Sequence, residues 1–325
     1  MRFLLTLLLV FGLVSITPTP AQEDEIVANL AGGRIIIHVA NDGIVFAAID
    51  HPLEAKSVPP RVAALGSTHV GVFFGASEWQ VPAQPRPIRL DRDVSDMRSA
   101  ATYTYSPPGS GDPDLELIGV GFLEKLRPLV SQLHSKIDLK PDEPLVEIVL
   151  IGYGPQGYGP EVWRIDYRAE QKSISANSNF LQTDILRPQF TQLYPPEKHQ
   201  AKTLIEASFP ASQQPTPLIG LIQANDLRIA RICSSEPRFA KVAEHIDRGQ
   251  ANKVTMQDAG DFLRAALPFL AGDAKFVEGE VGETGGFQWI VPPQEPREKT
   301  NRAEAEDKDR PPDAPTLMRK PNPNN

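Results

Sequence analysis

The stretch Gly32–Asp50 reads GGRIIIHVANDGIVFAAID, and it predicts how the fold begins. Two runs rich in β-branched and apolar residues, 34–40 and 44–50, flank the pair Asp42-Gly43. An Asp-Gly pair between two such runs is a strong signal for a β-hairpin, because both residues tolerate the backbone angles of a tight turn. We therefore expect a hairpin that turns at Asp42-Gly43.

The next segments predict a second strand pair and then a long loop. Residues 61–65 and 69–74 are short apolar runs that turn at Gly66-Ser67. Residues 76–112 are polar and rich in proline, which is typical of a long irregular connection.

The clearest helix pattern begins at Asp112-Pro113 and ends near Lys136. Aspartate is a good N-cap, and proline suits the first helical position. Pro128 is expected to bend this helix. Apolar residues recur at helical spacing and form one face: Leu115, Ile118, Phe122, Leu126, Leu129, Val130 and Leu133.

A buried strand pair is predicted within Leu145–Arg168. The run 146–151 is almost entirely apolar, as in a strand buried on both faces, and 162–167 runs back after a glycine-rich turn. This turn lacks the GK[ST] ending and the following helix of a phosphate-binding loop, so we interpret it as a hairpin loop.

The last third predicts two helices and a final strand. Residues 238–248 have one apolar face, and Thr255–Asp258 fits a capping pattern that starts a helix to about Leu270. Phe287–Val291 predicts the last strand. Residues 169–215 show little pattern apart from an amphipathic piece at 202–208, and two apolar runs, 218–222 and 227–232, fit either strand or helix.

The N-terminus predicts export. Met1-Arg2 is followed by an apolar run, Phe3–Ile16, and by small residues ending at Ala21. This pattern is typical of a signal peptide cleaved after Ala21, and the run is short for a membrane anchor, so we expect no stable membrane insertion after cleavage. The protein is therefore expected to be secreted or periplasmic; the alternative is an uncleaved anchor.

The remaining composition bounds the domains and partners. After residues 1–21, we expect an N-terminal arm at 22–31, a folded domain at 32–293 and a disordered, charged, proline-rich tail at 294–325. A formal net charge of −8 argues against nucleic-acid binding. Cys233 is the single cysteine, so no disulfide can form within one chain.

The order of segments and five local sequences resemble proteasome-type β-subunits, a family of N-terminal-nucleophile hydrolases. The opening hairpin, IIIHVANDGIVFAAID, resembles the start of that domain. The later matches are RVAALGSTHVGVFFGASEW at 61–79, LVEIVLIGYGPQGYGPEVWRID at 145–166, TMQDAGDFLRAALPFLA at 255–271 and VGETGGFQWIV at 281–291. The fold implied is α+β, a four-layer αββα sandwich of antiparallel sheets.

The resemblance also implies where catalytic groups would lie. In active members, cleavage after a glycine exposes a nucleophile whose own α-amine is the base, with a lysine and an acid nearby. The matching positions here are Gly33 for the nucleophile, Arg61 for the lysine, and Ile49 for the acid, with Asp50 one residue later. Glycine has no side chain to attack a substrate, and arginine stays charged. We therefore expect no catalytic residue at these positions, and a protein that acts by binding or by homo-oligomeric assembly.

Two other hypotheses remain open from the sequence. The first is an active peptidase or amidohydrolase with a relocated nucleophile, Cys233 or a serine. The second is an envelope scaffold whose tail, 294–325, binds a partner. The six histidines show no metal-binding spacing and no G-x-S-x-G motif occurs, so no metal or cofactor is predicted. A homo-oligomer formed by the helices 112–136 and 255–270 is expected, and a protein or peptide partner is possible.

Overall fold

Two antiparallel sheets form the middle of the molecule in the computed structural model, which describes residues 26–51, 58–65, 69–82, 84–92, 115–133, 143–153, 159–173, 181–195 and 203–293. Every named helix and strand lies within Met1–Pro292. The predicted signal peptide, the whole of the predicted tail and the loops at 93–114, 134–142 and 154–158 lie outside the described residues.

Within the described residues, the larger sheet has seven strands in the order β1-β5-β7-β8-β11, with β4 and β6 also paired to β5. Its strands are β1 (Val27–Ala31), β4 (Arg61–Ala64), β5 (His69–Gln80), β6 (Ile88–Arg89), β7 (Val146–Tyr153), β8 (Pro160–Tyr167) and β11 (Gln189–Tyr194). A two-stranded ribbon of β9 (Ala169–Ser173) and β10 (Leu181–Ile185) lies between β8 and β11 in the chain.

The smaller sheet is ordered β12-β2-β3-β13-β14, so the opening hairpin occupies its middle. Its strands are β2 (Gly33–Val39), β3 (Gly43–Asp50), β12 (Leu204–Phe209), β13 (Phe276–Gly282) and β14 (Gly286–Val291). The helices are α2 (Leu115–Val130), α3 (Leu218–Gln223), α4 (Leu227–Ser235), α5 (Pro237–Asp247) and α6 (Met256–Ala271), with short 3₁₀ turns η1 (Ala211–Gln213) and η2 (Ala251–Lys253).

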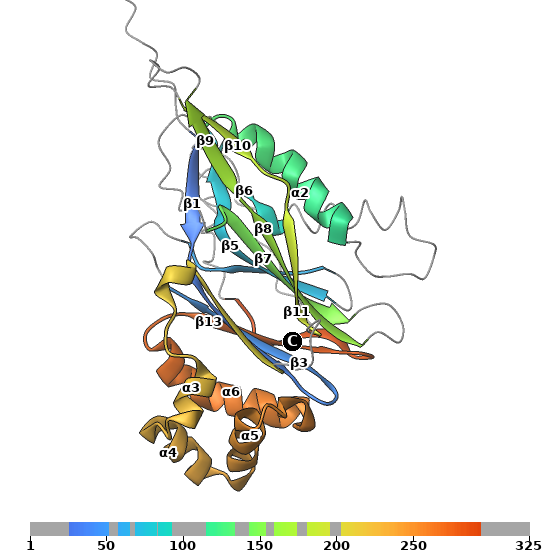
Figure 1. Ribbon diagram of the computed structural model, residues 1–325, viewed down its shortest axis with the longest axis vertical. Coiled ribbons are helices and arrows are strands. Elements are labelled where there is room, and N and C mark those ends of the chain that lie inside the picture. The colour runs from blue at the N-terminus through green and yellow to red at the C-terminus, as the bar shows by residue number, and fades with distance from the viewer. Residues whose placement is uncertain are drawn as a thin grey trace, which may run out of the picture. The chain divides into compact units, whose positions relative to one another are not determined.

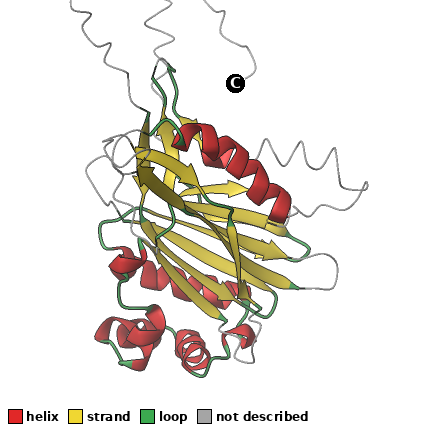
Figure 2. Cartoon of the chain, turned by 45° about the horizontal axis from the view of Figure 1, so that its top comes forward, coloured by secondary structure: helices red, strands yellow, loops and turns green. Residues whose placement is uncertain are grey.

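Three apolar clusters show how these elements are layered (Figures 1 and 2). The first joins α2 to the outer face of the larger sheet, where the ring of Phe122 meets the ring of Tyr167 edge to face at 6.3 Å. The second lies between the two sheets, where Phe74 and Phe209 stack at 6.3 Å. The third joins the smaller sheet to α3–α6. The architecture is therefore mixed α+β, with antiparallel sheets and helices on both sides.

The predicted hairpin is confirmed, but its turn is one residue earlier than expected. Val39 pairs with Ile44, and the Ala40 amide donates to the Gly43 carbonyl at 2.8 Å, so the residues at the turn are Asn41 and Asp42. Gly43 does not have positive φ. A Cβ there would lie 2.3 Å from Met256 Sδ at the start of α6, so a larger residue would require the Met256 side chain to move.

The predicted cap of α6 is confirmed. Thr255 Oγ1 accepts a hydrogen bond from the Asp258 amide at 3.1 Å, as the capping pattern requires. A second cap comes from the hairpin, because Asp42 Oδ1 accepts from the Met256 amide at 2.6 Å. The turn of the opening hairpin therefore helps to fix the first turn of α6.

The loop predicted over 76–112 is wrong at its start. β5 continues to Gln80 and pairs with β1, and β6 follows at Ile88–Arg89. The strand passes Gly75, which has φ of +76° and whose Cβ would lie 2.3 Å from the Leu145 carbonyl oxygen. This glycine lets the strand pass close to its neighbour and continue.

The segment without a clear sequence pattern, 169–215, contains four strands, and the two ambiguous runs that follow it are helices. The four strands are β9 to β12, of which β11 has no fully buried residue. The runs 218–222 and 227–232 form α3 and α4. Four further predictions are confirmed. The second strand pair is β4 with β5, the buried pair within 145–168 is β7 with β8, the helix at 238–248 is α5, and the last strand is β14.

Candidate functional site

Gly33, the position of the nucleophile in the resemblance, begins β2 and pairs directly with Asp50 at the end of β3. Paired residues of antiparallel strands lie on one face, and here it is the face of Ile35 and Ile37, which points toward the larger sheet. A Cβ at Gly33 would lie 2.5 Å from the Ile49 carbonyl oxygen and 2.7 Å from Pro60 Cγ. The structure has no room for a side chain at this position.

Asp50 is the acid that shares the face of Gly33, while Ile49 points to the helices and belongs to the cluster beneath them. Burial raises the pKa of the Asp50 carboxyl, and the charges of Lys275 and His51 partly oppose this. Asp50 Oδ1 is buried, and no hydrogen-bond partner is recorded for it within the described chain. Asp50 and Gly33 line a small cavity of about 130 Å³.

Arg61, the position of the lysine, is held by an ion pair away from this cavity. Its Nη2 donates to Glu78 Oε2 at 2.8 Å, and the other oxygen of Glu78 accepts from Asn29 at 3.2 Å. Arg61 is not among the residues that line the cavity at Gly33. It therefore links β1, β4 and β5 and does not line the cavity at Gly33.

Arg34 is the buried cation of the small cavity, and it is already paired. Its guanidinium forms an ion pair with Glu206 and donates to the Thr216 carbonyl oxygen at 3.3 Å. Glu206 also accepts from the Ile219 amide at 3.3 Å, at the start of α3. These contacts join β2, β12 and α3, which is a structural role.

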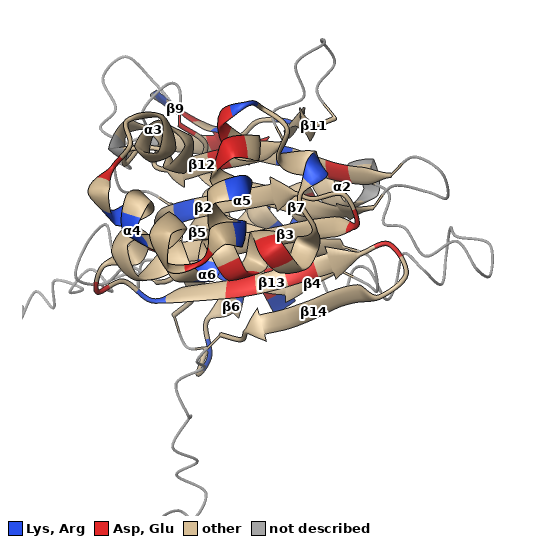
Figure 3. Ribbon diagram, turned by 90° about the horizontal axis from the view of Figure 1, so that it is seen from below, with Lys and Arg blue, Asp and Glu red and all other residues tan. Residues whose placement is uncertain are grey.

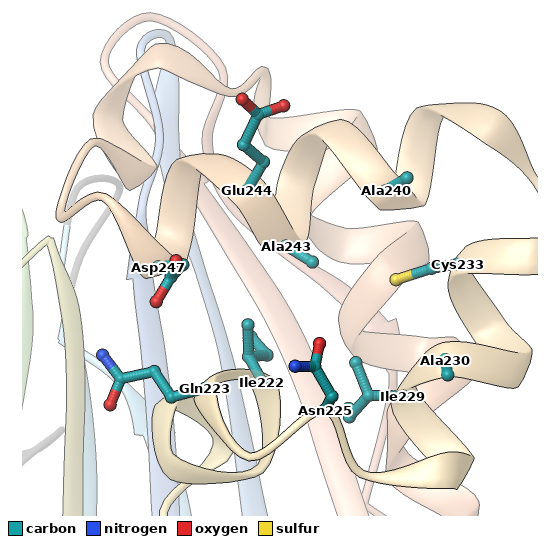
Figure 4. Close-up of a pocket in the computed structure, with 10 residues that line it drawn as sticks. All are labelled: Ile222, Gln223, Asn225, Ile229, Ala230, Cys233, Ala240, Ala243, Glu244 and Asp247. Carbon is teal, nitrogen blue, oxygen red and sulfur yellow. The ribbon is translucent and has the colours of Figure 1, made fainter.

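A larger cavity of about 470 Å³ is a groove among α3, α4 and α5 (Figure 4). Its lining combines apolar and polar side chains: Ile222, Gln223, Asn225, Ile229, Ala230, Cys233, Ala240, Ala243, Glu244 and Asp247. Acidic and basic residues are interspersed over the surrounding helical layer (Figure 3). One of them, Arg238, links α5 to α6 through Asp261 at 2.7 Å.

Cys233 lies in this groove but lacks the surroundings of an activated thiol. Its Sγ lies 3.7 Å from the Phe239 carbonyl oxygen, to which it donates a weak hydrogen bond. Burial raises its pKa, whereas a nucleophilic cysteine needs a lowered one. The charged groups of the lining are Glu244 and Asp247, and no histidine of the described chain lines the groove. This geometry does not favour a nucleophile at Cys233.

Two further buried titratable groups are Glu147, which sequence patterns did not single out, and His38, which alternates with apolar residues in its strand and which the sequence predicts to be a surface or core residue and not a base. Glu147 on β7 faces Asp166 on β8 across the strand pair; burial raises the Glu147 pKa to about 7, the charge of Asp166 adds to this, and Arg164 partly opposes it. His38 on β2 points to the helices, where its Nε2 lies 2.9 Å from the Ala251 carbonyl oxygen. Burial lowers the His38 pKa to about 4.

Neither group has the surroundings of a reactive site. Glu147 is the single charged residue of the otherwise largely apolar β7, and the register of β7 with β8 places it opposite Asp166. No cluster of His, Cys, Asp and Glu in the described residues could hold a metal ion. Among the same residues, no helix is long and apolar enough to cross a membrane.

No protein-family model matches this sequence, and no curated protein matches it either. What the molecule does therefore follows from its own geometry.

Proposed function

We propose that this chain is an exported protein with the αββα sandwich of N-terminal-nucleophile hydrolases, that it has no catalytic nucleophile, and that it acts by binding. The layering supports the fold assignment: α2, the larger sheet, the smaller sheet and α3–α6 pack in that order. The resemblance begins with the opening hairpin, which occupies the middle of the smaller sheet.

The observation that carries the proposal is the closed position at Gly33. A nucleophile there would need a side chain, and its Cβ alone would overlap the Ile49 carbonyl and the Pro60 ring. Contacts below 3.0 Å with backbone cannot be relieved by a rotamer change. Restoring a threonine would therefore require the end of the sheet to move.

The residues ahead of Gly33 give independent support. Active members remove the chain before the nucleophile, whereas here β1 forms part of the larger sheet and pairs with β5 from Val27 to Ala31. Cleavage between Gly32 and Gly33 would cut between β1 and β2, which belong to different sheets. A strand that completes a sheet argues against its removal.

Self-association is the form of binding that the resemblance implies, and the side of α2 offers a surface for it. Val120 is 48% exposed and Phe190 on β11 is 36% exposed, and the Phe190 ring lies against Gly119. The other expected surface, on α6, is largely covered, because α4 and α5 pack against that helix. We therefore assign assembly to the α2 side alone.

Catalytic inactivity is tested with the exported protein by intact mass and by hydrolysis of fluorogenic peptide substrates. We expect a mass that begins at Gln22 and no hydrolysis above the buffer rate, in the wild type and in Cys233→Ser alike. A mass that begins at Gly33, together with hydrolysis, would overturn the proposal. Hydrolysis that disappears in Cys233→Ser would instead establish the relocated nucleophile.

Assembly is tested by light scattering at micromolar concentration. We expect a mass above that of the monomer, which Phe190→Lys lowers. Leu227→Lys is the matched control, because Leu227 is 86% exposed on α4, away from α2. A clean monomer for the wild type would contradict the proposal of self-association. Binding to other partners would then be the remaining form of the proposed function.

A further inference from the structure

We propose that the groove among α3, α4 and α5 binds a cationic amphipathic ligand, namely an ammonium group carried on a short apolar body. This step goes beyond the proposed function, and it would stand even if the position at Gly33 proved to be catalytic. It rests on the size of the groove, the separation of its apolar and polar ends, and the sign of its charge.

The size of the groove suits a small ligand or one side chain of a partner. Its volume of about 470 Å³ lies within the range of roughly 300–1,000 Å³ that is typical of ligand sites. The cavity beside Gly33 is about 130 Å³, which is too small for such a molecule. The groove is therefore the better candidate of the two.

Small side chains keep the groove open. Ala230 on α4 and Ala240 on α5 are exposed and line it from two different helices, with Cys233 beside them (Figure 4). Ile222 and Ile229 are buried and form its apolar floor. Larger residues at Ala230 and Ala240 would fill this space, so the groove exists because the side chains at these positions are small.

Two polar groups lie at the other end. Figure 4 shows Gln223 and Asp247 there, Asn225 near the middle beside Ile222 and Ile229, and Cys233, Ala230 and Ala240 at the opposite end. Asn225 has φ of +48° in the turn between α3 and α4, a backbone conformation that asparagine tolerates better than most residues. Amide oxygens at Gln223 and Asn225 can accept hydrogen bonds from an ammonium group.

The charge of the lining selects a cation. Its two charged residues are Glu244 and Asp247, and Glu244 is paired with Arg248 at 2.7 Å. No ion pair is recorded for Asp247 in the described part of the chain, so its charge is available to a ligand. Asp247 is also the last residue of α5, and the C-terminal end of a helix favours positive charge. An anion would be repelled by both features.

Cys233 supplies a reporter, because it is the single cysteine of the chain and lines the apolar end. The experiment measures the rate at which methyl methanethiosulfonate modifies Cys233 in the full exported chain. Hexylammonium is the probe; hexanoate and hexanol are matched in length and differ in charge. Mass spectrometry follows the modification, and calorimetry measures binding directly.

We expect hexylammonium to slow the modification saturably, with a Kd on the order of 1 mM, which is realistic for so small a ligand. Hexanoate should give no protection, and hexanol less than hexylammonium. Asp247→Asn should weaken hexylammonium binding about tenfold, as expected when a charged hydrogen-bond partner is lost. Asp273→Asn, an exposed acid outside the groove, is the matched control and should leave it unchanged.

Three results would overturn the proposal. They are the absence of protection by hexylammonium, equal protection by hexanoate, and unchanged binding in Asp247→Asn. Circular dichroism checks that each variant is folded, and Ala240→Leu provides a second variant that should block binding by filling the apolar end. Neither measurement depends on hydrolysis, so a failure here is distinguishable from a failure of the proposed function.

Discussion

Two cavities of the described chain differ in what surrounds them, and the difference separates a filled position from an open one. Beside the small cavity, a Cβ at Gly33 would meet the Ile49 carbonyl oxygen and the Pro60 ring. In the groove of the helical layer, Ala230, Ala240 and Cys233 leave space beside the larger side chains of the lining. The space for a side chain at Gly33 is filled by neighbouring atoms, whereas the groove of the helical layer leaves space at the surface.

The polar groups of the two regions differ in the same sense. Beside Gly33, the guanidinium of Arg34 is held by Glu206 and by the Thr216 carbonyl. In the groove, Asp247 is exposed at the end of a helix. The ion pair of Arg34 favours stability in the first region, where Asp50 Oδ1 is nevertheless buried without a hydrogen-bond partner in the described chain. The exposed charge of Asp247 in the second region favours binding. The following changes test this contrast, from the largest expected effect to the smallest.

Gly33→Thr should be the most damaging substitution, because it places a side chain where backbone already lies. We expect the free energy of unfolding to fall by about 3 kcal/mol or more, since overpacking against a carbonyl forces the strand end to move. Chemical denaturation measures this change. The variant should also gain no hydrolytic activity.

Gly220→Ala is the control for Gly33→Thr. A Cβ at Gly220 in α3 would have its nearest contact at 3.7 Å, an ordinary van der Waals distance. Alanine in a helix should then stabilise by up to about 1 kcal/mol relative to glycine. Similar losses in both variants would contradict the closed site at Gly33.

Glu147→Gln should change how stability depends on pH in the layer between the sheets. Because burial raises the Glu147 pKa to about 7, the folded state binds more protons than the unfolded chain between about pH 4.5 and pH 7. Stability is therefore lost as pH rises through that range, by about 3 kcal/mol. The variant should lack this loss and be more stable than the wild type at pH 8, as measured by denaturation at several pH values.

His38→Gln should act in the opposite direction on the helical side of the smaller sheet. Burial lowers the His38 pKa to about 4, so the unfolded chain binds more protons between about pH 4 and pH 6.5. Stability is therefore lost as pH falls through that range, again by up to about 3 kcal/mol. Glutamine keeps a donor for the Ala251 carbonyl without this titration, so an unchanged acid slope in the variant would contradict the assignment.

The parts of the fold that could be predicted from sequence are those whose signals are local. The opening hairpin follows from alternating apolar residues around a turn, and α6 follows from Thr255 and Asp258 at capping distance. The turn lies one residue earlier than predicted because Gly43 already belongs to β3, where its carbonyl accepts from the Ala40 amide, and packs against Met256, a residue distant in sequence. The local sequence pattern therefore predicts the hairpin, whereas contacts with residues distant in sequence decide the exact position of its turn.

The parts that could not be predicted depend on long-range packing. β11 (QFTQLY) has no buried residue and lacks a strict alternation of apolar and polar residues, so its pairing with β8 defines it. The closure at Gly33 requires Pro60 and Phe74, which lie on other segments. The groove arises from the placement of three short helices, and sequence spacing gives no measure of that placement.

Ala240→Leu should have the smallest effect on stability and a clear effect on binding. Ala240 is exposed on α5, so a larger side chain meets no backbone, and we expect a change in unfolding free energy within about 0.5 kcal/mol. The leucine would occupy the apolar end of the groove and slow the modification of Cys233 even without ligand. A larger side chain should therefore lower the free energy of unfolding strongly at Gly33 and hardly at all at Ala240. This difference is expected if the space at Gly33 is filled and the groove at Ala240 is open. A large loss of stability in Ala240→Leu would mean that the groove is closed in solution, and the contrast between the two cavities would fail.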